Sequence, residues 1–306
     1  MLQALLIIVA GLILAAMGGL LFAERSGRVQ PSTRALVRER GGARRHSLSL
    51  LHSYVYARFP KEYIGYALKN ILPKMTAAER QSAADHYHGK VLPTELAQAL
   101  VTHEHDLALR DLEQIIPYPV ARSLLLKGPP DIAVFECPCR AAREHPCEPT
   151  QVCMIVGQPF VDFILEHHPA KSRRLTPREA VDLLQAEHAR GHLHAAYFKD
   201  AMLDRFYAIC NCCKCCCGGI ESMVRHGVPM ITSSGYVAQI EDTYCTACGT
   251  CAEACPFGAI QVDATAHVTF EKCMGCGVCE GQCAQGAISL ALDARKGLPL
   301  DVRAFA

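Results

Sequence analysis

All 18 cysteines of this 306-residue chain lie between Cys137 and Cys283. Cysteine makes up about 6% of the chain, which is more than in an ordinary intracellular enzyme and less than in a small disulfide scaffold. Disulfides that staple a secreted domain are spread along the chain, whereas the ligands of metal clusters come in tight groups. This distribution therefore favours cysteines that bind metal.

Eight of these cysteines form one spacing pattern, C-x2-C-x2-C-x3-C, that occurs twice. The first run is Cys245, Cys248, Cys251 and Cys255, and the second is Cys273, Cys276, Cys279 and Cys283. An Ala-Ile pair follows each run, so the whole unit is duplicated. A cubane iron–sulfur cluster needs three thiolates from one tight loop and a fourth from elsewhere. C-x2-C also suits structural zinc, but two complete copies favour iron and sulfur.

These two runs resemble the bacterial-type two-[4Fe–4S] ferredoxin domain over about residues 236–292. The resemblance implies a ferredoxin-like (βαβ)2 fold with two [4Fe–4S] clusters, each taking its fourth cysteine from the other run. The first cluster would be held by Cys245, Cys248, Cys251 and Cys283, and the second by Cys273, Cys276, Cys279 and Cys255. Ala284 stands where the family usually has proline, a residue that ligates nothing.

The remaining cysteines form two groups: Cys137, Cys139, Cys147 and Cys153, then Cys210, Cys212, Cys213, Cys215, Cys216 and Cys217. Unbound thiols at this density are prone to oxidation, so we predict one or two additional iron–sulfur clusters, with a subset as ligands. Each group would hold one cluster, or the two groups would share ligands. Neighbouring cysteines point in different directions, so some are not ligands. Zinc and a cluster that binds substrate at an open iron are the alternatives.

The segment from about 115 to 292, with its Cys137-Pro-Cys139-Arg140 motif, resembles cysteine-rich iron–sulfur proteins of anaerobic bacteria. This resemblance supports further clusters but implies no reaction. We expect the 14 histidines at the surface or at helix ends, and single out His194 as a ligand or proton carrier to test. The chain has no nucleotide-binding, serine-hydrolase or covalent-haem motif, so no catalytic residue is assigned.

Residues 4–23 are uncharged and long enough, at about 1.5 Å per residue, to cross a bilayer. No basic residue precedes this run, so 1–23 is predicted to be a retained transmembrane anchor rather than a signal peptide. Residues 24–60 would be a basic juxtamembrane linker ending in a short amphipathic helix over 47–59. Its arginines place the soluble part on the cytoplasmic side of the inner membrane, as a single-pass protein.

The rest of the chain is divided into a helical region 61–128, a cysteine-rich iron–sulfur domain 129–235, the ferredoxin domain 236–292 and a tail 293–306. Capping boxes that begin at Thr76 and at Thr176 predict helices, and another helix is expected after Pro93. Residues 131–135 are expected to form a short strand. The fold class is α+β, with an N-terminal transmembrane helix, a mainly helical middle region and the C-terminal ferredoxin-like domain.

The predicted function is that of a membrane-anchored electron-transfer protein that relays electrons between a soluble redox partner and a membrane redox subunit. Residues 236–292 carry six carboxylates against one lysine, which favours a soluble partner with a basic face. The net charge of +1 argues against nucleic acid as a partner. The alternatives are a reductase whose 137–217 site acts on a substrate and a redox or metal sensor. An electron carrier or redox subunit is favoured over a stand-alone enzyme.

Overall fold

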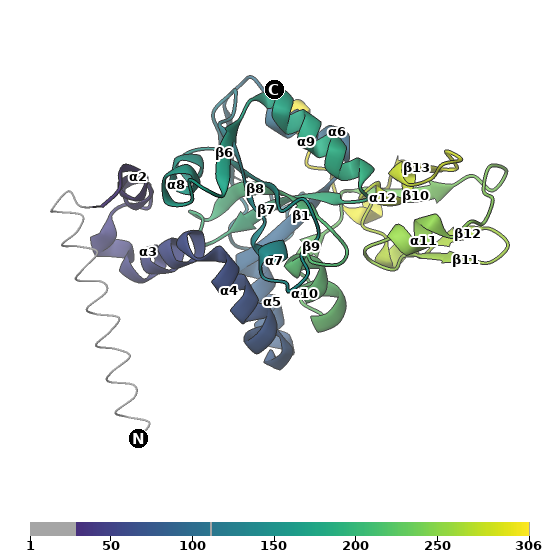
Figure 1. Cartoon of the computed structure of the whole chain (residues 1–306), viewed down its shortest axis with the longest axis horizontal. Helices are drawn as coiled ribbons and strands as arrows, with labels where there is room; N and C mark the ends of the chain where they lie inside the picture. Colours follow the sequence, from purple (N-terminus) through teal and green to yellow (C-terminus); the bar gives the residue numbers. More distant parts are fainter. Residues whose placement is uncertain (1–28, 111, 306) are drawn as a thin grey trace.

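The computed structural model describes residues 29–110 and 112–305 (Figure 1). The predicted transmembrane anchor, 1–23, lies outside the described residues, so the anchor and its orientation stay predictions. In the part of the chain that is described, no helix has the length and apolar character needed to cross a membrane.

A seven-stranded sheet occupies the middle of the molecule, in the order β6-β4-β5-β8-β7-β1-β9. Neighbouring strands pair antiparallel, except β1 and β9, which are parallel. The strands are β1 (Tyr87–Leu92), β4 (Ile132–Glu136), β5 (Gln151–Val156), β6 (Ser172–Leu175), β7 (Leu193–Lys199), β8 (Arg205–Cys212) and β9 (Ile231–Thr232).

This sheet corrects the prediction of a mainly helical middle region. It takes β1 from the range 61–128, which was expected to be helical, and its other strands from 129–235. Every residue of β7 is buried, so the strand has no alternation of apolar and polar positions. A short run that is buried on both faces cannot be told from a buried helix by periodicity. The strand expected over 131–135 is confirmed as β4.

The helices pack around the sheet. They are α2 (Pro31–Glu39), α3 (Ala43–Arg58), α4 (Pro60–Tyr66), α5 (Ala77–His86), α6 (Thr94–Thr102), α7 (Pro138–Ala141), α8 (Phe160–His167), α9 (Pro177–Ala189) and α10 (Gly218–His226). A π-helical turn η1 (Ala67–Ile71) and a 3-10 turn η2 (Leu72–Lys74) follow α4, and a short hairpin pairs β2 (Leu107–Leu109) with β3 (Leu124–Leu126). In Figure 1, α6 and α9 lie toward the top and α4, α5 and α10 toward the bottom.

Local signals predicted several of these helices correctly. The capping boxes at Thr76 and Thr176 are both formed, with each threonine hydroxyl accepting from the backbone N–H three residues later. The helix expected after Pro93 is α6. A cap of this kind contributes about 1 kcal/mol and fixes where a helix begins.

The prediction of a basic linker over 24–60 is corrected here, because most of this segment forms two packed helices, α2 and α3. Leu36 of α2 is only 2% exposed, and Glu39 Oε1 lies 2.6 Å from Arg205 Nη1 of β8. Thr33 of α2 also lies within hydrogen-bond distance of His167, at the end of α8. The helix expected over 47–59 overlaps α3, which ends at Arg58. The segment is rich in arginine, which suggested a linker, but an apolar contact, an ion pair and a hydrogen bond hold α2 against α8 and β8.

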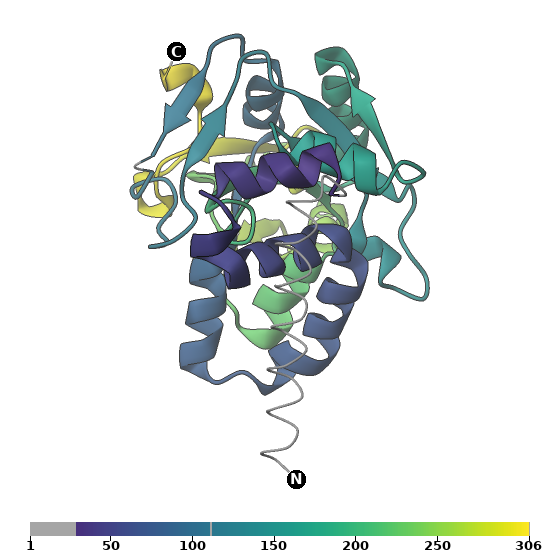
Figure 2. The same cartoon turned by 90° about the vertical axis from the view of Figure 1, so that its left-hand side faces the viewer.

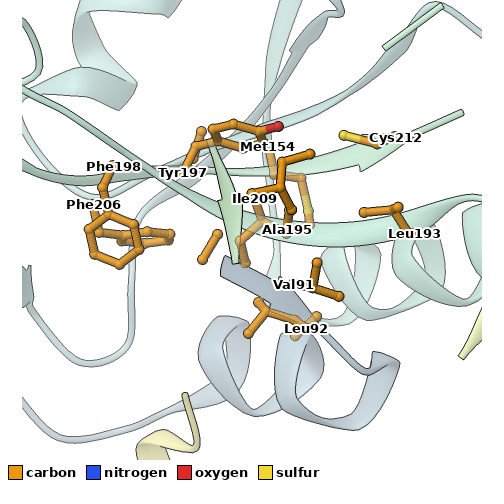
Figure 3. Close-up of a cluster of buried hydrophobic side chains, with 14 of the residues drawn as sticks. Val91, Leu92, Met154, Leu193, Ala195, Tyr197, Phe198, Phe206, Ile209 and Cys212 are labelled. Atoms are coloured by element: carbon orange, nitrogen blue, oxygen red, sulfur yellow. The ribbon is translucent and has the colours of Figure 1, made fainter. Parts of the chain in front are cut away.

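The core of the sheet extends directly to the cysteines. Figure 3 shows Cys212 at the end of β8 among buried side chains of β1, β5, β7 and β8, including Ile209 and Leu193. Burying an apolar side chain of this size contributes about 1.5–3 kcal/mol. The strands that carry several of the middle cysteines are therefore held rigidly.

Residues 236–292 form a separate module at the right of Figure 1, which we call the ferredoxin-like module. Its elements run β-α-β twice, as the resemblance predicts: β10 (Tyr236–Ile240), α11 (Thr250–Ala254), β11 (Ile260–Val262), then β12 (Ala266–Val268), α12 (Val278–Gly281) and β13 (Ile288–Leu292). β10 pairs with β13, and β11 with β12, both antiparallel. The tail adds the 3-10 turns η4 (Ala294–Lys296) and η5 (Val302–Phe305), and η5 contacts α6.

Candidate iron–sulfur and cysteine sites

The first three cysteines of the second run and the last cysteine of the first run come together in the ferredoxin-like module. One small cavity is lined by sulfur-bearing residues from both runs: Cys255, Cys273, Cys276 and Cys279. Each of them is 7–8% exposed. Burial raises the pKa of Cys276 to about 12, with a further contribution from Cys255 and Cys273 as neighbours. These four are the ligands that the resemblance implies for the second cluster.

The chemistry of this cavity fits an iron–sulfur cluster. Uncompensated thiolates are costly in a buried site, and bound iron supplies the missing positive charge. Backbone N–H groups already point at the sulfurs: Ala238 N lies 3.5 Å from Cys273 Sγ and Ala259 N lies 3.3 Å from Cys255 Sγ. Such donors stabilise cluster sulfurs and tune the reduction potential.

The first run lies nearer to solvent. Cys248 is exposed and Cys245 is half-buried, whereas Cys251 lies buried at the start of α11. Burial raises the pKa of Cys251, and Cys245 and Cys248 add to this effect, so the three are neighbours. Cys283, the fourth ligand implied for this cluster, follows α12, which packs against α11. The ligand assignments of both clusters stay predictions.

Six of the ten middle cysteines form a continuous set, four of them buried and two half-buried, which we call the interior group. They line one cavity, which Cys213 also lines, and are linked by contacts between their thiols in the order Cys139, Cys137, Cys153, Cys210, Cys212, Cys217. The Sγ atoms of Cys153 and Cys210 are 3.9 Å apart. Hydrogen bonds from Cys153 and Cys212 lower the pKa of Cys210 to about 6, because they stabilise its thiolate. A set of sulfurs this dense suits a metal centre better than free thiols.

The other four middle cysteines, Cys147, Cys213, Cys215 and Cys216, form the outer group. The Sγ atoms of Cys147, Cys213 and Cys215 lie within 4.8 Å of one another. Cys216 Sγ lies 3.5 Å from Cys215 Sγ and accepts from the backbone N–H of Cys147 at 3.4 Å. This spacing suits a single zinc or iron ion, or a cluster.

The structure therefore groups the middle cysteines across the two sequence groups rather than within them. Of the two predicted arrangements, shared ligands agree with this geometry. The adjacent pair Cys216–Cys217 is divided between the outer and the interior group, and Cys213 lies at the border, because it lines the interior cavity and also lies close to Cys147 and Cys215. Successive side chains of a strand point to opposite faces, so residues two apart share a face. Cys210 and Cys212 of β8 therefore both point into the interior group.

A buried polar network lies between the two groups. Arg140 is 1% exposed, and its Nη2 lies 3.0 Å from Glu187 Oε2 and donates to the carbonyl of Asn211 at 3.1 Å. His192 Nδ1 donates to the same carboxylate oxygen at 2.7 Å, and its Nε2 lies 3.8 Å from Cys147 Sγ. Burial alone would raise the pKa of Glu187, but His192 and Arg140 outweigh it and hold the pKa below its usual value. The guanidinium adds positive charge beside sulfurs of both groups.

Sequence reasoning did not assign these roles to Arg140, Glu187 and His192. A signal was present, because Glu187 follows Ala180, Leu183 and Leu184 on the apolar face of the helix after Thr176. A carboxylate at a core position requires a buried partner. In metal sites, a histidine commonly donates a hydrogen bond from one ring N–H to a carboxylate and presents its other ring nitrogen to the metal.

Helix α10 begins at the interior group. Cys217 is its N-cap residue, and the backbone N–H groups of Ile220 and Gly218 lower the pKa of Cys217 and Cys139, respectively, although burial and neighbouring thiols raise both overall. The partial positive charge at a helix N-terminus favours anionic sulfur. Glycine at position 219 is required, because a Cβ there would collide with the hydroxyl of Tyr197.

The expectation of surface histidines is wrong for His88, His192 and His194, which are 0%, 6% and 0% exposed. His88 stacks on Tyr118 with ring centroids 4.0 Å apart. His194 Nδ1 donates to Asn211 Oδ1 at 2.6 Å, and burial lowers the pKa of His194 to about 4. A neutral buried His194 is a better hydrogen-bond acceptor than a proton carrier at neutral pH.

The ferredoxin-like module contacts the cysteine-rich part of the sheet domain. Lys214, which stands between Cys213 and Cys215 of the outer group, donates from its Nζ to the carbonyl of Glu253 in α11 at 2.6 Å. Gln282 Nε2, after α12, donates to the carbonyl of Ala189 at the end of α9 at 3.1 Å. His188 of α9 lies against Gly277 and Gly281, which flank Cys279. Helix α12, which carries Cys279, therefore faces α9 of the sheet domain.

Comparison with known proteins supports part of this assignment. Residues 238–261 match the family model of a 4Fe-4S binding domain, which covers the first cysteine run. No curated protein and no solved structure matches the chain. The chain thus contains a 4Fe-4S binding domain, and an iron–sulfur redox role follows from it.

Proposed function

We propose that this protein is an iron–sulfur electron carrier in which the ferredoxin-like module exchanges electrons with metal centres held by the middle cysteines. The observation that carries the proposal is the contact between Lys214 and Glu253, which holds the cysteine-rich loop 210–217 against the module. Two redox centres must be close for electrons to pass between them.

The different exposure of the two cysteine runs suggests in which direction electrons pass. The cluster at Cys245, Cys248 and Cys251 lies nearer to solvent, so it is the entry point for electrons from a soluble partner. The cluster at Cys255, Cys273, Cys276 and Cys279 is buried and faces α9. Electrons would pass from the first to the second and then to the sheet domain.

The middle cysteines would hold one or two centres. The interior group has six sulfurs, enough for a [4Fe–4S] cluster with ligands to spare. The outer group, with His192 beside Cys147, would hold a second cluster or a single metal ion. Arg140, buried between the groups, would offset the negative charge of both centres.

The partners are proposed from charge and from the N-terminal segment. All six carboxylates of the module are exposed, which suits a soluble partner with a basic face. Residues 1–23 would anchor the protein in the cytoplasmic membrane beside a membrane redox subunit. Anchoring would limit the search for that subunit to the membrane plane.

The route is tested by following cluster reduction with time. The full chain, purified without oxygen, is reduced by a flash-activated deazaflavin and frozen at intervals for electron paramagnetic resonance. We expect the module signal to appear first and a second signal, from the middle centres, to follow. Cys248→Ser should delay that second signal, whereas Thr246→Ser in the same exposed loop should not. Equal kinetics in both variants, or no signal from the middle region, would contradict the proposal.

A further inference from the structure

A second cavity adjoins the interior group on the side of α4, α5 and α10. Figure 2 shows α10, in green, between the helical segments 60–74 and 77–86, in darker and lighter blue. The cavity has a volume of about 430 Å³ and is open to solvent. This volume is large enough for a small organic molecule. The π-helical turn η1 forms part of its wall, and π-helical turns are frequent at functional sites.

Most of the cavity wall is apolar. Its long side is formed by residues from η1, η2, the loop before β9 and their neighbours: Ile64, Leu68, Leu72, Met75, Val228 and Met230. A wall of this composition does not favour a highly charged substrate such as a nucleotide. It favours a ligand with an apolar ring or chain.

Polar groups gather at one end of this cavity. Lys199 is 4% exposed, with its Nζ 3.4 Å from Asp200 Oδ1 and 4.7 Å from the centre of the Tyr87 ring. His52 Nε2 lies 3.0 Å from the hydroxyl of Tyr63 beside it. A buried cation with a neighbouring hydroxyl and imidazole suits a carbonyl oxygen, which accepts hydrogen bonds and gains negative charge on reduction.

The cavity shares a thin wall with the interior group. Cys139, Tyr87 and Gly219 line both cavities. Gly218 keeps this wall thin, because a Cβ there would lie 3.3 Å from Cys139 Sγ. A ligand in the cavity therefore lies directly against a sulfur of the interior group, which is the arrangement needed to pass electrons to it.

We propose that this cavity binds a quinone, which the centre of the interior group reduces. This inference rests on the proposed function and names its electron acceptor. Iron–sulfur centres release one electron at a time, so the acceptor must take up electrons singly, and a quinone does so. Two electrons from the clusters and two protons, delivered through the Tyr63 and His52 pair from solvent, convert both carbonyls to hydroxyls. The soluble donor then reduces the oxidised clusters again.

Menadione serves as the probe for the full-length protein under anaerobic conditions. Its binding to the oxidised protein is measured by calorimetry, and the reoxidation of dithionite-reduced clusters by their absorbance. Ala67→Phe, which fills the cavity, should weaken binding and slow reoxidation about tenfold, the equivalent of about 1.4 kcal/mol. Ala78→Phe, exposed on α5, is the matched control and should change neither. Reoxidation by ferricyanide should be the same in all variants.

Two further variants keep the test decisive if Ala67→Phe does not fold. Ala83→Phe fills the same cavity from α5, and Lys199→Met removes the cation at its polar end, with Lys69→Met as the exposed control. Normal cluster reduction without menadione binding would overturn this inference and leave the proposed function standing. Equal effects of cavity and control variants would also overturn it. A chain without clusters would overturn both.

Discussion

The two cysteine-rich regions of this protein are built on different principles. In the ferredoxin-like module, the tight loop of the second run brings Cys273, Cys276 and Cys279 together, and the first run supplies Cys255. In the sheet domain, the interior group takes its sulfurs from α7, β5, β8 and the start of α10, which are far apart in sequence. Local spacing positions the sulfurs in the first region, and strand register positions them in the second.

This difference has a consequence for stability. The module has short strands of three to five residues and little apolar core, so bound metal has to supply much of its folding free energy. The sheet domain has a large apolar core around β7 and β8 that positions its cysteines without metal. The two regions should therefore respond differently to the same perturbations.

Removal of iron should have the largest effect and should separate the two regions. After treatment with a chelator and reductant, backbone amides of β10 to β13 should lose most of their protection against hydrogen exchange. Amides of β7 and β8 should stay protected, because buried apolar side chains hold these strands in place. Equal loss of protection in both regions would show that the sheet domain also needs metal to fold.

Arg140→Met should cost at most about 3–5 kcal/mol of unfolding free energy, because it removes the buried guanidinium partner of Glu187 and leaves that carboxylate with Arg190 and His192 alone. Chemical denaturation of the full chain measures this effect. The double variant Arg140→Met with Glu187→Leu is the control, and it should recover much of the loss since no buried charge remains. No recovery would mean that the loss comes from packing rather than from the ion pair.

Stability of the sheet domain should rise with pH because of Lys90 in β1. Burial lowers the pKa of Lys90 from 10.5 to about 7, so between these values the unfolded chain binds a proton that the folded chain does not. The free energy of unfolding should then rise by at most about 1.4 kcal/mol per pH unit from pH 7 upward. Lys90→Met should remove this slope in denaturation curves. An unchanged slope would assign the pH dependence to other groups.

Gly219→Ala should have a smaller effect, about 1–3 kcal/mol, because the added methyl group collides with the hydroxyl of Tyr197. Gly65→Ala in α4 is the control, since its Cβ would lie 3.5 Å from Ala142 Cβ and a helix favours alanine over glycine. Thermal denaturation measures both. Destabilisation of equal size in the two variants would contradict a specific clash at Gly219.

The sequence predicted what depends on local spacing. The order of elements in the module and the helices that begin after Thr76 and Thr176 all follow from residues close together in the chain. The sheet was not predicted, because its buried strands lack an alternating pattern. The division of Cys216 from Cys217 depends on the direction in which each side chain points. The docking of α2 depends on its contacts with α8 and β8.

The central claim is that both cysteine regions hold iron–sulfur centres. Mössbauer spectroscopy with iron and sulfide analysis, on full-length protein produced with iron-57 and purified without oxygen, tests it most directly. The account predicts more than about eight iron atoms per chain, with cubane-type spectra from the module and additional iron from the middle cysteines. A colourless protein that contains zinc and no acid-labile sulfide would contradict it.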